Sequence, residues 1–335
     1  MTAQDIQGIS ALLATPKKIA IIPHRSPDGD AMGSTLGMYH FLLKMGHSPV
    51  VIAPNEFPGF LAWLPASEKV LIFEKDKKNV EKVLQESELI FVMDFNALHR
   101  TGEMENVLNK LDAPFIMIDH HQKPDTFAKY TYSNTAFGST CEMLYNFISL
   151  LGKKDLIDKT IATCIYTGIV TDSGSFRFPS TTSATHRIVA DLIDLGIENG
   201  HIHSDLFDNN SYQSLQLLGK ALQNLRVLPN GKASYITLSQ KELDSYNYVK
   251  GDTEGIVNYG LSIKGVIFTA IFIEHNDENI IKISLRSKGD FDVNQFARDH
   301  FSGGGHINAA GGKSTLSMEE TVKKFEDIVN RIKNI

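Results

Sequence analysis

The sequence predicts an α/β protein, with a parallel-sheet domain in its N-terminal half and a smaller α+β domain after it. In the first half, short apolar runs alternate with amphipathic stretches, which is the pattern of βαβ units. In the second half, strands follow one another before the helices come, which is typical of an α+β domain. A chain of 335 residues has room for two such domains.

The first half contains four apolar runs that we predict as strands: Lys18–Pro23, Pro49–Ala53, Glu88–Phe95 and Pro114–Ile118. Helical periodicity covers four further stretches, which we predict as helices flanking the sheet: Ala31–Met45, Ser139–Leu151, Asp158–Thr171 and Ser183–Leu195. In parallel sheets of this kind, ligands bind beyond the carboxyl ends of the strands. Residues that follow the predicted strands are therefore the first candidates for a functional site.

A largely polar helical stretch, from His201 to about Arg226, is predicted to link the two domains. We place the domains at residues 1–200 and 223–335, with the helical linker at 201–222. The second domain is predicted to contain strands, then a helix, a glycine-rich loop and a final helix. These elements are Ala233–Leu238, Val266–Glu274, Ile280–Arg286, Asp292–His300 and Met318–Ile332.

The composition excludes several classes of partner. A formal net charge of −6 argues against tight binding of long duplex DNA, which selects for a basic surface. No apolar run approaches the roughly 20 residues of a membrane span, and the first residues resemble no signal peptide. Cys141 and Cys164 lie in apolar stretches and are expected to be core residues of a reducing compartment. We therefore expect a cytoplasmic protein that does not bind membranes.

Acidic residues and histidines gather where the predicted strands end. A single Asp at such a place is ordinarily a helix cap. Several groups at one sheet edge are different, because crowded carboxylates raise one another's pKa and a divalent metal would neutralise them. The candidates are His24, Asp28 and Asp30 after the first strand, Asp94 after the third, Asp119, His120 and His121 after the fourth, and Asp172 after a later apolar stretch.

Carboxylate and imidazole ligands suit Mn²⁺ especially, with Mg²⁺, Co²⁺ or Zn²⁺ as alternatives, and the absence of cysteine from this cluster argues against a thiolate zinc site. Two divalent ions about 3.5–4 Å apart can activate a water molecule and stabilise the attacking and leaving oxygens at phosphorus. Phosphoester hydrolysis is the reaction that such a pair predicts. Six residues could hold the two ions and share one bridging carboxylate: His24, Asp28, Asp30, Asp94, His120 and Asp172.

Four segments resemble, in order and spacing, the motifs of the DHH phosphoesterase superfamily: HRSPDGD, VMDF, IDHH and TDSG. A fifth, SGGGH at Ser302–His306 followed by AAGG, resembles the glycine-rich loop of the accessory DHHA1 domain. The motifs span residues 24–312, so the resemblance covers nearly the whole chain. It implies a catalytic, metal-binding DHH domain and a substrate-binding DHHA1 domain. The superfamily includes RecJ-like exonucleases, family II pyrophosphatases, cyclic-di-AMP phosphodiesterases and nano-RNase/3′-phosphoadenosine-5′-phosphate phosphatases.

The resemblance also implies roles for the residues of the first four motifs. It assigns His24 and Asp28 to one ion, Asp30, His120 and Asp172 to the other, and the bridging position to Asp94. The two catalytic residues that it implies are Asp119 and His121. Asp119 would orient the metal ligand His120 without binding the ion itself, and His121 would face the scissile phosphate.

Substrate contacts are expected from both domains. Arg100, shortly after Asp94, resembles a family residue that contacts phosphate, and a surface ion pair is its alternative. Consecutive glycines let backbone N–H groups approach a phosphate closely, and arginine forks match phosphate oxygens. The second domain would therefore bind the nucleotide through Arg286, Ser287, Gly303, Gly304, Gly305 and His306.

Within the superfamily, chain length and domain content favour the compact two-domain type. The expected function is two-metal hydrolysis of short oligoribonucleotides to nucleoside monophosphates, and of 3′-phosphoadenosine-5′-phosphate to AMP and phosphate. Its partners are then short single-stranded RNA, dinucleotides and nucleoside bisphosphate, and a homodimer is compatible with this type. Hydrolysis of cyclic-di-AMP or linear dinucleotides is the first alternative. Pyrophosphate or polyphosphate hydrolysis comes next, and a non-catalytic nucleotide-binding module last, because all six candidate ligands are present.

Overall fold

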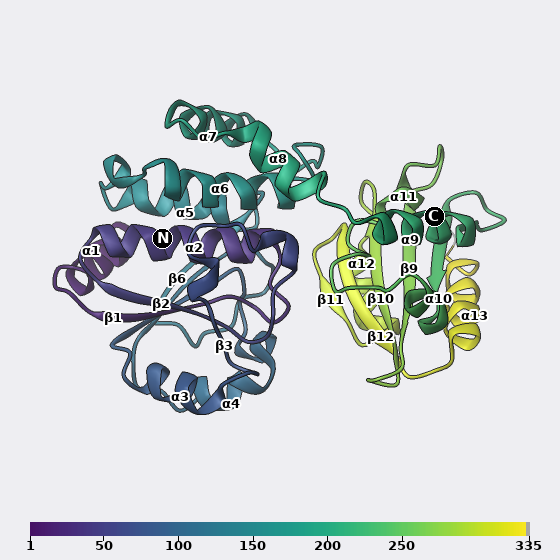
Figure 1. The fold of residues 1–335 in the computed structure, drawn as a ribbon, viewed down its shortest axis with the longest axis horizontal. Coiled ribbons are helices and arrows are strands. Elements are labelled where there is room, and N and C mark those ends of the chain that lie inside the picture. The colour runs from purple at the N-terminus through teal and green to yellow at the C-terminus, as the bar shows by residue number, and fades with distance from the viewer. Residues whose placement is uncertain (333–335) are drawn as a thin grey trace. The chain divides into compact units, whose positions relative to one another are not determined.

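The computed structural model describes residues 1–332 of the chain, which forms two compact units, Met1–Asn209 and Asn210–Ile335. Unit 1 holds a six-stranded parallel sheet and unit 2 a mixed six-stranded sheet, each with helices packed against it (Figure 1). The predicted α/β class, with a parallel sheet in the N-terminal part and a second sheet in the C-terminal part, is therefore confirmed. The division between the units falls between two helices, at residues 209 and 210.

The sheet of unit 1 has the strand order β3-β2-β1-β4-β5-β6, and all neighbouring strands pair in parallel. The chain moves outward from β1 in one direction and then returns to continue from β4 in the other. This order is doubly wound, and ligands of such sheets bind where the order reverses, here between β1 and β4. The strands are β1 (Lys18–Ile22), β2 (Ser48–Ala53), β3 (Leu71–Ile72), β4 (Leu89–Met93), β5 (Phe115–Asp119) and β6 (Tyr130–Ser133).

Helices cover both faces of this sheet (Figure 1). One face carries α1 (Ala3–Leu12), α2 (Gly29–Lys44), α5 (Thr140–Leu150), α6 (Lys159–Asp172), α7 (Ser183–Asp194) and α8 (Asn199–Phe207). The other carries α3 (Lys77–Gln85) and α4 (Glu105–Leu108). Short 3₁₀ turns lie at η1 (Gly59–Leu61), η2 (Ser67–Lys69), η3 (Leu98–Met104) and η4 (Lys154–Leu156). Because both faces are covered, β4 and β5 are buried along their whole length, as their continuous apolar sequences predict.

Helices α2 and α6 pack antiparallel and very closely. A Cβ atom added at Gly33 would lie 2.5 Å from the Cys164 carbonyl oxygen, and one at Gly168 would lie 2.7 Å from Oδ1 of Asp30 in α2. The absence of side chains at these glycines brings the beginning of α2 beside the end of α6. Cys141 and Cys164 are both buried free thiols at this junction, which confirms their prediction as core residues.

Unit 2 has the strand order β11-β12-β10-β9-β8-β7, with β8 and β9 parallel and the other pairs antiparallel. Helices α12 and α13 pack on one face, and α9, α10 and α11 on the other. The strands are β7 (Arg226–Val227), β8 (Ala233–Leu238), β9 (Phe268–His275), β10 (Ile280–Ser287), β11 (Gly304–Gly305) and β12 (Ala309–Ser314). The helices are α9 (Tyr212–Asn224), α10 (Gln240–Ser245), α11 (Asn258–Leu261), α12 (Val293–His300) and α13 (Met318–Val329).

The stretch from His201 to Arg226, which we predicted as a helical linker, contains parts of two helices. Helix α8 ends at Phe207 and α9 begins at Tyr212, so the helical pattern is interrupted. Leu217 and Ala221 of α9 are buried in the core of unit 2, because α9 packs on the sheet rather than spanning open solvent. The buried apolar residues of α9 face the sheet and most of its polar residues face outward, as is usual for an amphipathic helix at the surface.

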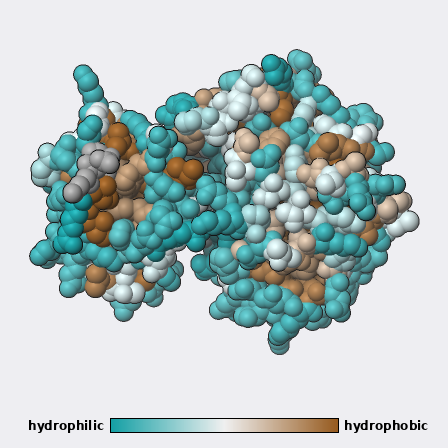
Figure 2. All heavy atoms as spheres, turned by 180° about the vertical axis from the view of Figure 1, so that it is seen from behind, coloured by the Kyte–Doolittle hydropathy of each residue, from teal (hydrophilic) through white to brown (hydrophobic). Residues whose placement is uncertain are grey.

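The surface is largely hydrophilic on the face seen in Figure 2, with hydrophobic residues interspersed in small groups. Among residues 1–332, no helix combines the length and the apolar character that crossing a membrane requires.

Candidate metal centre

The first group of candidate ligands lies where β1 leads into α2. Asp28 caps α2, and its Oδ1 accepts hydrogen bonds from the backbone N–H groups of Asp30 and Ala31 at 3.1 and 3.0 Å. Its other oxygen, Oδ2, lies 3.7 Å from Nε2 of His24. Asp28 is thus a helix cap with one oxygen left facing the imidazole, so the structural and the ligand roles are compatible.

Asp94 follows β4 and lies between two groups of side chains. Its side chain is 2% exposed, and its backbone has a φ of 65°, which is uncommon for a residue other than glycine. Oδ2 lies 3.5 Å from Nε2 of His24, and Oδ1 lies 3.5 Å from Nε2 of His120. The two oxygens of one carboxylate therefore face different imidazoles, which is the arrangement that a bridging ligand needs.

The second group consists of Asp30, His120 and Asp172. Nε2 of His120 lies 3.8 Å from Oδ2 of Asp30 and 3.4 Å from Oδ2 of Asp172. Asp172 is the last residue of α6, so it reaches the site from a helix end and not from the edge of the sheet. The expectation that all the acidic groups share one sheet edge needs this correction, and the close packing of α2 and α6 explains how Asp172 arrives there.

The donor atoms fit divalent ions. Separations of 3.4–3.8 Å between imidazole nitrogens and carboxylate oxygens are too long for hydrogen bonds. Two atoms bound to the same ion at 2.0–2.2 Å lie about 3.0–3.6 Å apart, so these spacings leave room for ions between the donors. The ligand atoms of His24, Asp28 and Asp94 lie within 4.8 Å of one another, as do those of Asp30, His120 and Asp172.

The orientation of both imidazoles agrees with a ligand role. Nδ1 of His24 lies 2.9 Å from the carbonyl oxygen of Arg25, and Nδ1 of His120 lies 3.3 Å from that of Phe137. A carbonyl oxygen only accepts, so each ring donates its Nδ1–H and keeps the lone pair of Nε2 for the carboxylate side. This is the tautomer that a metal-binding histidine requires.

Without an ion, protons take its place. Burial lowers the pKa of His24, but the interactions of its ring with the carboxylates of Asp28 and Asp94 outweigh burial and raise it to about 10. Burial likewise opposes the effect of Asp172, Asp94 and Asp30, which raise the pKa of His120 to about 9. Burial and the charges of Asp94 and Asp172 hold the pKa of Asp30 well above its usual range. The site therefore requires positive charge, which ions or protons can provide.

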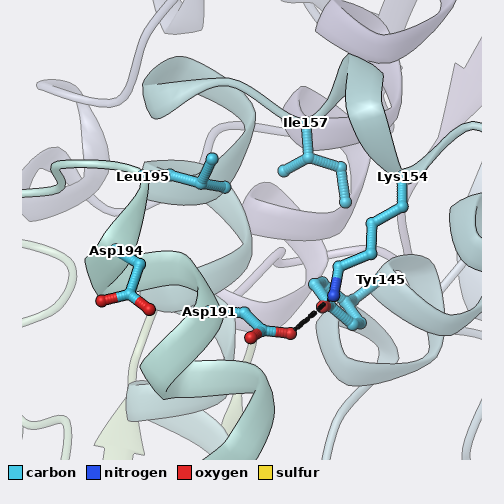
Figure 3. A pocket seen from close by; sticks show the side chains of 6 residues that line it. All are labelled: Tyr145, Lys154, Ile157, Asp191, Asp194 and Leu195. Atoms are coloured by element: carbon cyan, nitrogen blue, oxygen red, sulfur yellow. Dashed lines mark hydrogen bonds and ion pairs between the residues drawn. The ribbon is translucent and has the colours of Figure 1, made fainter.

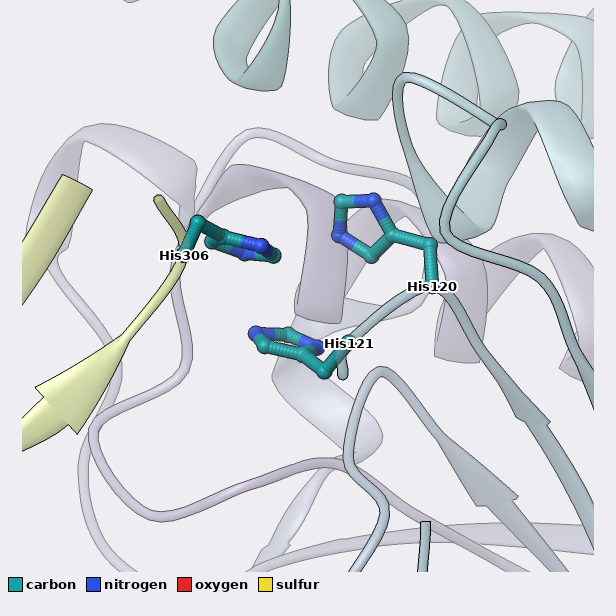
Figure 4. A group of neighbouring side chains, drawn as sticks. All are labelled: His120, His121 and His306. Atoms are coloured by element: carbon teal, nitrogen blue, oxygen red, sulfur yellow. The ribbon is translucent and has the colours of Figure 1, made fainter. Parts of the chain in front are cut away.

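Asp119 and His121 form a separate pair beside this centre, and Figure 4 shows His121 next to His120 after β5. Oδ1 of Asp119 lies 2.7 Å from Nδ1 of His121, and Oδ2 accepts the backbone N–H of His121 at 2.9 Å. The structure differs here from the expectation that Asp119 orients His120. The carboxylate of Asp119 contacts His121 instead, and Nδ1 of His121 also lies 3.7 Å from Oδ1 of Asp94.

The pKa of His121 is lowered, whereas those of His24 and His120 are raised. Burial and then the positive charge of Arg100 hold it well below its usual range, so the ring is neutral at pH 7. With Nδ1–H donated to Asp119, the lone pair of Nε2 is not used by that contact. Arg100 is partly exposed in η3, and its backbone oxygen accepts from the N–H of Arg25 at 2.8 Å.

The predicted substrate residues of unit 2 lie together at one end of its sheet. Arg286 pairs in register with Ala309, and Gly305 with Ala310, so the end of β10 and the glycine-rich loop are neighbours. A Cβ at Gly303 would lie 1.9 Å from the Gly311 carbonyl oxygen, and Gly305 has a φ of 152°. Close backbone packing thus requires glycines here, whatever they bind.

The hydroxyl of Ser287 has a local role in this end of unit 2. It donates to the carbonyl oxygen of Phe291 at 2.6 Å and accepts from the Asn308 side chain at 2.9 Å. Gly304 lies in β11, and His306, labelled in Figure 4, follows β11 with its N–H donated to the Ala309 carbonyl oxygen at 2.7 Å. The structure therefore clusters Arg286, Ser287 and the glycine-rich loop within unit 2.

A small cavity elsewhere in unit 1 has no comparable chemistry. It measures about 150 Å³ and lies among α5, η4 and α7 (Figure 3). Asp191 accepts hydrogen bonds there from the Tyr145 hydroxyl and, at 2.7 Å, from Lys154. Tyr145, Lys154 and Asp191 thus bind one another in this cavity, whereas the carboxylates and imidazoles around Asp94 face a common centre, so the cluster around Asp94 is the better candidate.

Sequence reasoning missed one buried residue of the site, Thr140. Its hydroxyl donates to Oδ1 of Asp94 at 2.9 Å. The sequence places Thr140 at the start of a predicted helix, where a threonine needs no further explanation. Its partner is 46 residues away in the chain, so no local pattern could indicate the contact.

Comparison with known proteins supports the two-part organisation. Residues 18–169 match the N-terminal domain of the DHH family, and residues 232–334 match the DHHA1 domain. A crystal structure of an exopolyphosphatase-related protein from Bacteroides fragilis superimposes with a TM-score of 0.94, at 38% identity over 98% of this chain and 96% of that one. RecJ of Thermus thermophilus, solved with Mn²⁺, has a TM-score of 0.57 at 13% identity, covering 99% of this chain and 55% of that one, which indicates fold alone.

Curated relatives align from end to end. The probable bifunctional oligoribonuclease and PAP phosphatase NrnA of Streptococcus mutans is 30% identical over 100% of this chain and 99% of its own length. The bifunctional oligoribonuclease and PAP phosphatase NrnA of Thermus thermophilus is 29% identical over 96% of this chain and 91% of that protein. With both domains matched in order and a full-length relative at this identity, the chain belongs to the DHH family of phosphoesterases and is a hydrolase with an accessory DHHA1 domain.

Proposed function

We propose that this chain is a two-metal phosphoesterase that hydrolyses short oligoribonucleotides to nucleoside monophosphates, and 3′-phosphoadenosine-5′-phosphate to AMP and phosphate. The observation that carries the proposal is the placement of Asp94, whose two oxygens face His24 on one side and His120 on the other. The names of the full-length relatives, which combine oligoribonuclease and PAP phosphatase, support the substrate class.

In this proposal, His24 and Asp28 would hold one divalent ion, Asp30, His120 and Asp172 would hold the other, and Asp94 would contribute to both. Such ions lower the pKa of water and neutralise charge on phosphate oxygens, and Mn²⁺ suits the mixed oxygen and nitrogen donors. Two RecJ structures that share the fold were solved with Mn²⁺.

The chain itself contributes a positioned imidazole and a cation. Asp119 fixes the ring of His121 through Nδ1, and the neutral imidazole would accept a proton through Nε2 at the scissile phosphate. Arg100, whose charge acts on His121, would attract the phosphate. In unit 2, Arg286 and the glycine-rich loop at 303–306 would bind the remainder of the nucleotide through phosphate oxygens and backbone N–H groups.

The test is a product-resolved assay with purified protein and Mn²⁺. Labelled RNAs of two to five nucleotides, 3′-phosphoadenosine-5′-phosphate, cyclic-di-AMP and pyrophosphate are compared at equal concentration. Release of monophosphates from short RNA and of phosphate from the bisphosphate is expected, and chelation of the metal should abolish both. If neither substrate is cleaved by metal-replete protein, the proposal is wrong.

Polyphosphate hydrolysis is the second candidate, because the Bacteroides fragilis structure at 38% identity is described as exopolyphosphatase-related. The ligand groups alone would serve pyrophosphate equally well. A faster rate on pyrophosphate or polyphosphate than on a dinucleotide, in the same assay, would favour this candidate over the first.

A further inference from the structure

Thr140 connects two of the carboxylates at the metal centre. It is the first residue of α5, and its side chain is completely buried. Its hydroxyl donates to Oδ1 of Asp94 at 2.9 Å, and its backbone N–H donates to Oδ2 of Asp30 at 2.6 Å. One residue therefore fixes an oxygen from the end of β4 and another from the beginning of α2.

The hydroxyl of Thr140 is not needed to start the helix. Ser139 is the N-cap of α5, and its hydroxyl accepts the N–H of Glu142 at 3.0 Å. Cys141 donates its own N–H to Oδ1 of Asp30 at 2.9 Å. Because Ser139 caps the helix, the hydroxyl of Thr140 is available to bind Asp94.

Both contacts of Thr140 lie on the same side of the centre. Oδ1 of Asp94 is the oxygen that faces His120, and Oδ2 of Asp30 is also the oxygen near His120. The last torsion of an aspartate side chain is soft, so a fixed donor decides where its two oxygens point. The donor at Oδ1 therefore fixes the oxygen of Asp94 that faces His120, whereas the oxygen that faces His24 is not the one that this hydrogen bond holds.

We propose that Thr140 is a positioning residue of the metal centre, whose hydroxyl orients Asp94 so that the Asp30, His120 and Asp172 group binds its ion tightly. This inference rests on the proposed pair of divalent ions. It assigns Thr140 no contact with substrate or with an ion, and it predicts unequal effects on the two ion sites.

The experiment is calorimetric titration of metal-free, full-length protein with Mn²⁺ in the absence of any substrate. Thr140→Val keeps the shape of the side chain and the backbone N–H but removes the hydroxyl. One of the two binding steps should weaken by about 10- to 100-fold, the usual effect of losing a partner of a ligand, while the other changes little. Thr140→Ser should restore the affinity, because it returns the hydroxyl.

Two ligand variants identify the affected step. Asp172→Asn removes a donor of the His120 side, and His24→Gln removes one of the opposite side. The step weakened in Thr140→Val should be the one that Asp172→Asn removes. Thr35→Val is the matched control, because Thr35 is also fully buried but its hydroxyl bonds only to the backbone oxygens of Ala31 and Met32.

Several results would overturn the inference. Equal Mn²⁺ affinity in wild type and Thr140→Val would show that the hydroxyl does not position the site, while the two-ion proposal would stand. A loss of metal-free thermal stability without a change in affinity would assign Thr140 a purely structural role. If Thr140→Val does not fold, Thr140→Ala is read in the same way. Wild-type protein that binds no divalent ion would overturn the two-ion proposal and the role of Thr140 with it.

Discussion

Units 1 and 2 bury different kinds of polar side chain. Unit 1 buries ionisable groups, among them Asp30, Asp94 and Asp119, each no more than 2% exposed. In the described residues of unit 2, the buried polar side chains are all neutral: Ser214, Ser234, Thr269, Ser287, Asn294, Ser314 and Thr321. Burying a charged group is costly in free energy unless the group is paired or binds a metal. The concentration of buried ionisable groups in unit 1 therefore makes this unit the candidate for the catalytic site. Unit 2 would instead bind through its backbone and the half-buried cation of Arg286.

The sharpest test of this contrast is Asp94→Asn. Loss of the charge between the two groups should reduce kcat by at least about a thousandfold, because both of the proposed ions would depend on it. Mn²⁺ stoichiometry measured by calorimetry should fall together with the rate. Asp76→Asn is the control, since Asp76 caps α3 and asparagine caps equally well. A variant that keeps both ions and most of its activity would contradict a bridging role.

Arg286→Ala tests whether unit 2 contributes binding without chemistry. Loss of a charge-assisted phosphate contact should raise KM for a dinucleotide by about 10- to 100-fold, with a smaller change in kcat and none in Mn²⁺ affinity. Steady-state kinetics at saturating Mn²⁺ measures this. The matched variant, Arg226→Ala, removes an exposed arginine of β7 and should leave KM unchanged. A fall in Mn²⁺ affinity in Arg286→Ala would contradict the proposal that unit 2 contributes only substrate binding.

The buried charges of unit 1 also predict a pH dependence. The pKa of His24 in the metal-free fold is about 10 and that of His120 about 9, both above the ordinary value of 6.5. Between pH 7 and 9 the folded state therefore binds more protons than the unfolded state, and its free energy of unfolding should fall as pH rises.

Urea unfolding of metal-free protein at pH 7, 8 and 9 measures this slope. Mn²⁺ should weaken or reverse it, because the ion replaces the protons and binds the deprotonated imidazoles. Metal-free stability that rises with pH over this range would contradict the proposed protonation of His24 and His120.

A pair of glycines gives the smallest effect. Gly168→Ala places a Cβ 2.2 Å from Cys141 Sγ and 2.7 Å from Oδ1 of Asp30, so it should lower the free energy of unfolding by about 1–3 kcal/mol. Gly219→Ala, in helix α9 of unit 2, meets nothing within 4 Å and should stabilise by up to about 1 kcal/mol. Denaturant titration compares them, and equal effects would argue against tight packing of α2 on α6.

The apolar runs of β1, β2, β4 and β5 and the helix after His24 could be predicted from the sequence, because burial on both faces requires continuous apolar residues. The short edge strands β3 and β6 were missed. Two or four residues that are only partly buried carry too little pattern to be recognised. Their pairing depends on a neighbouring strand that is already in place.

The sequence by itself determined which residue types could bind metal, because the order of aspartates and histidines after apolar runs is a local property of the chain. Only the tertiary structure decided their partners. Asp172 reaches His120 from a helix end, Asp119 pairs with His121, and Thr140 donates to Asp94. The physical reason is that strand and helix patterns depend on near neighbours. Contacts between distant side chains depend on how helices pack, here on the glycines that let α2 approach α6.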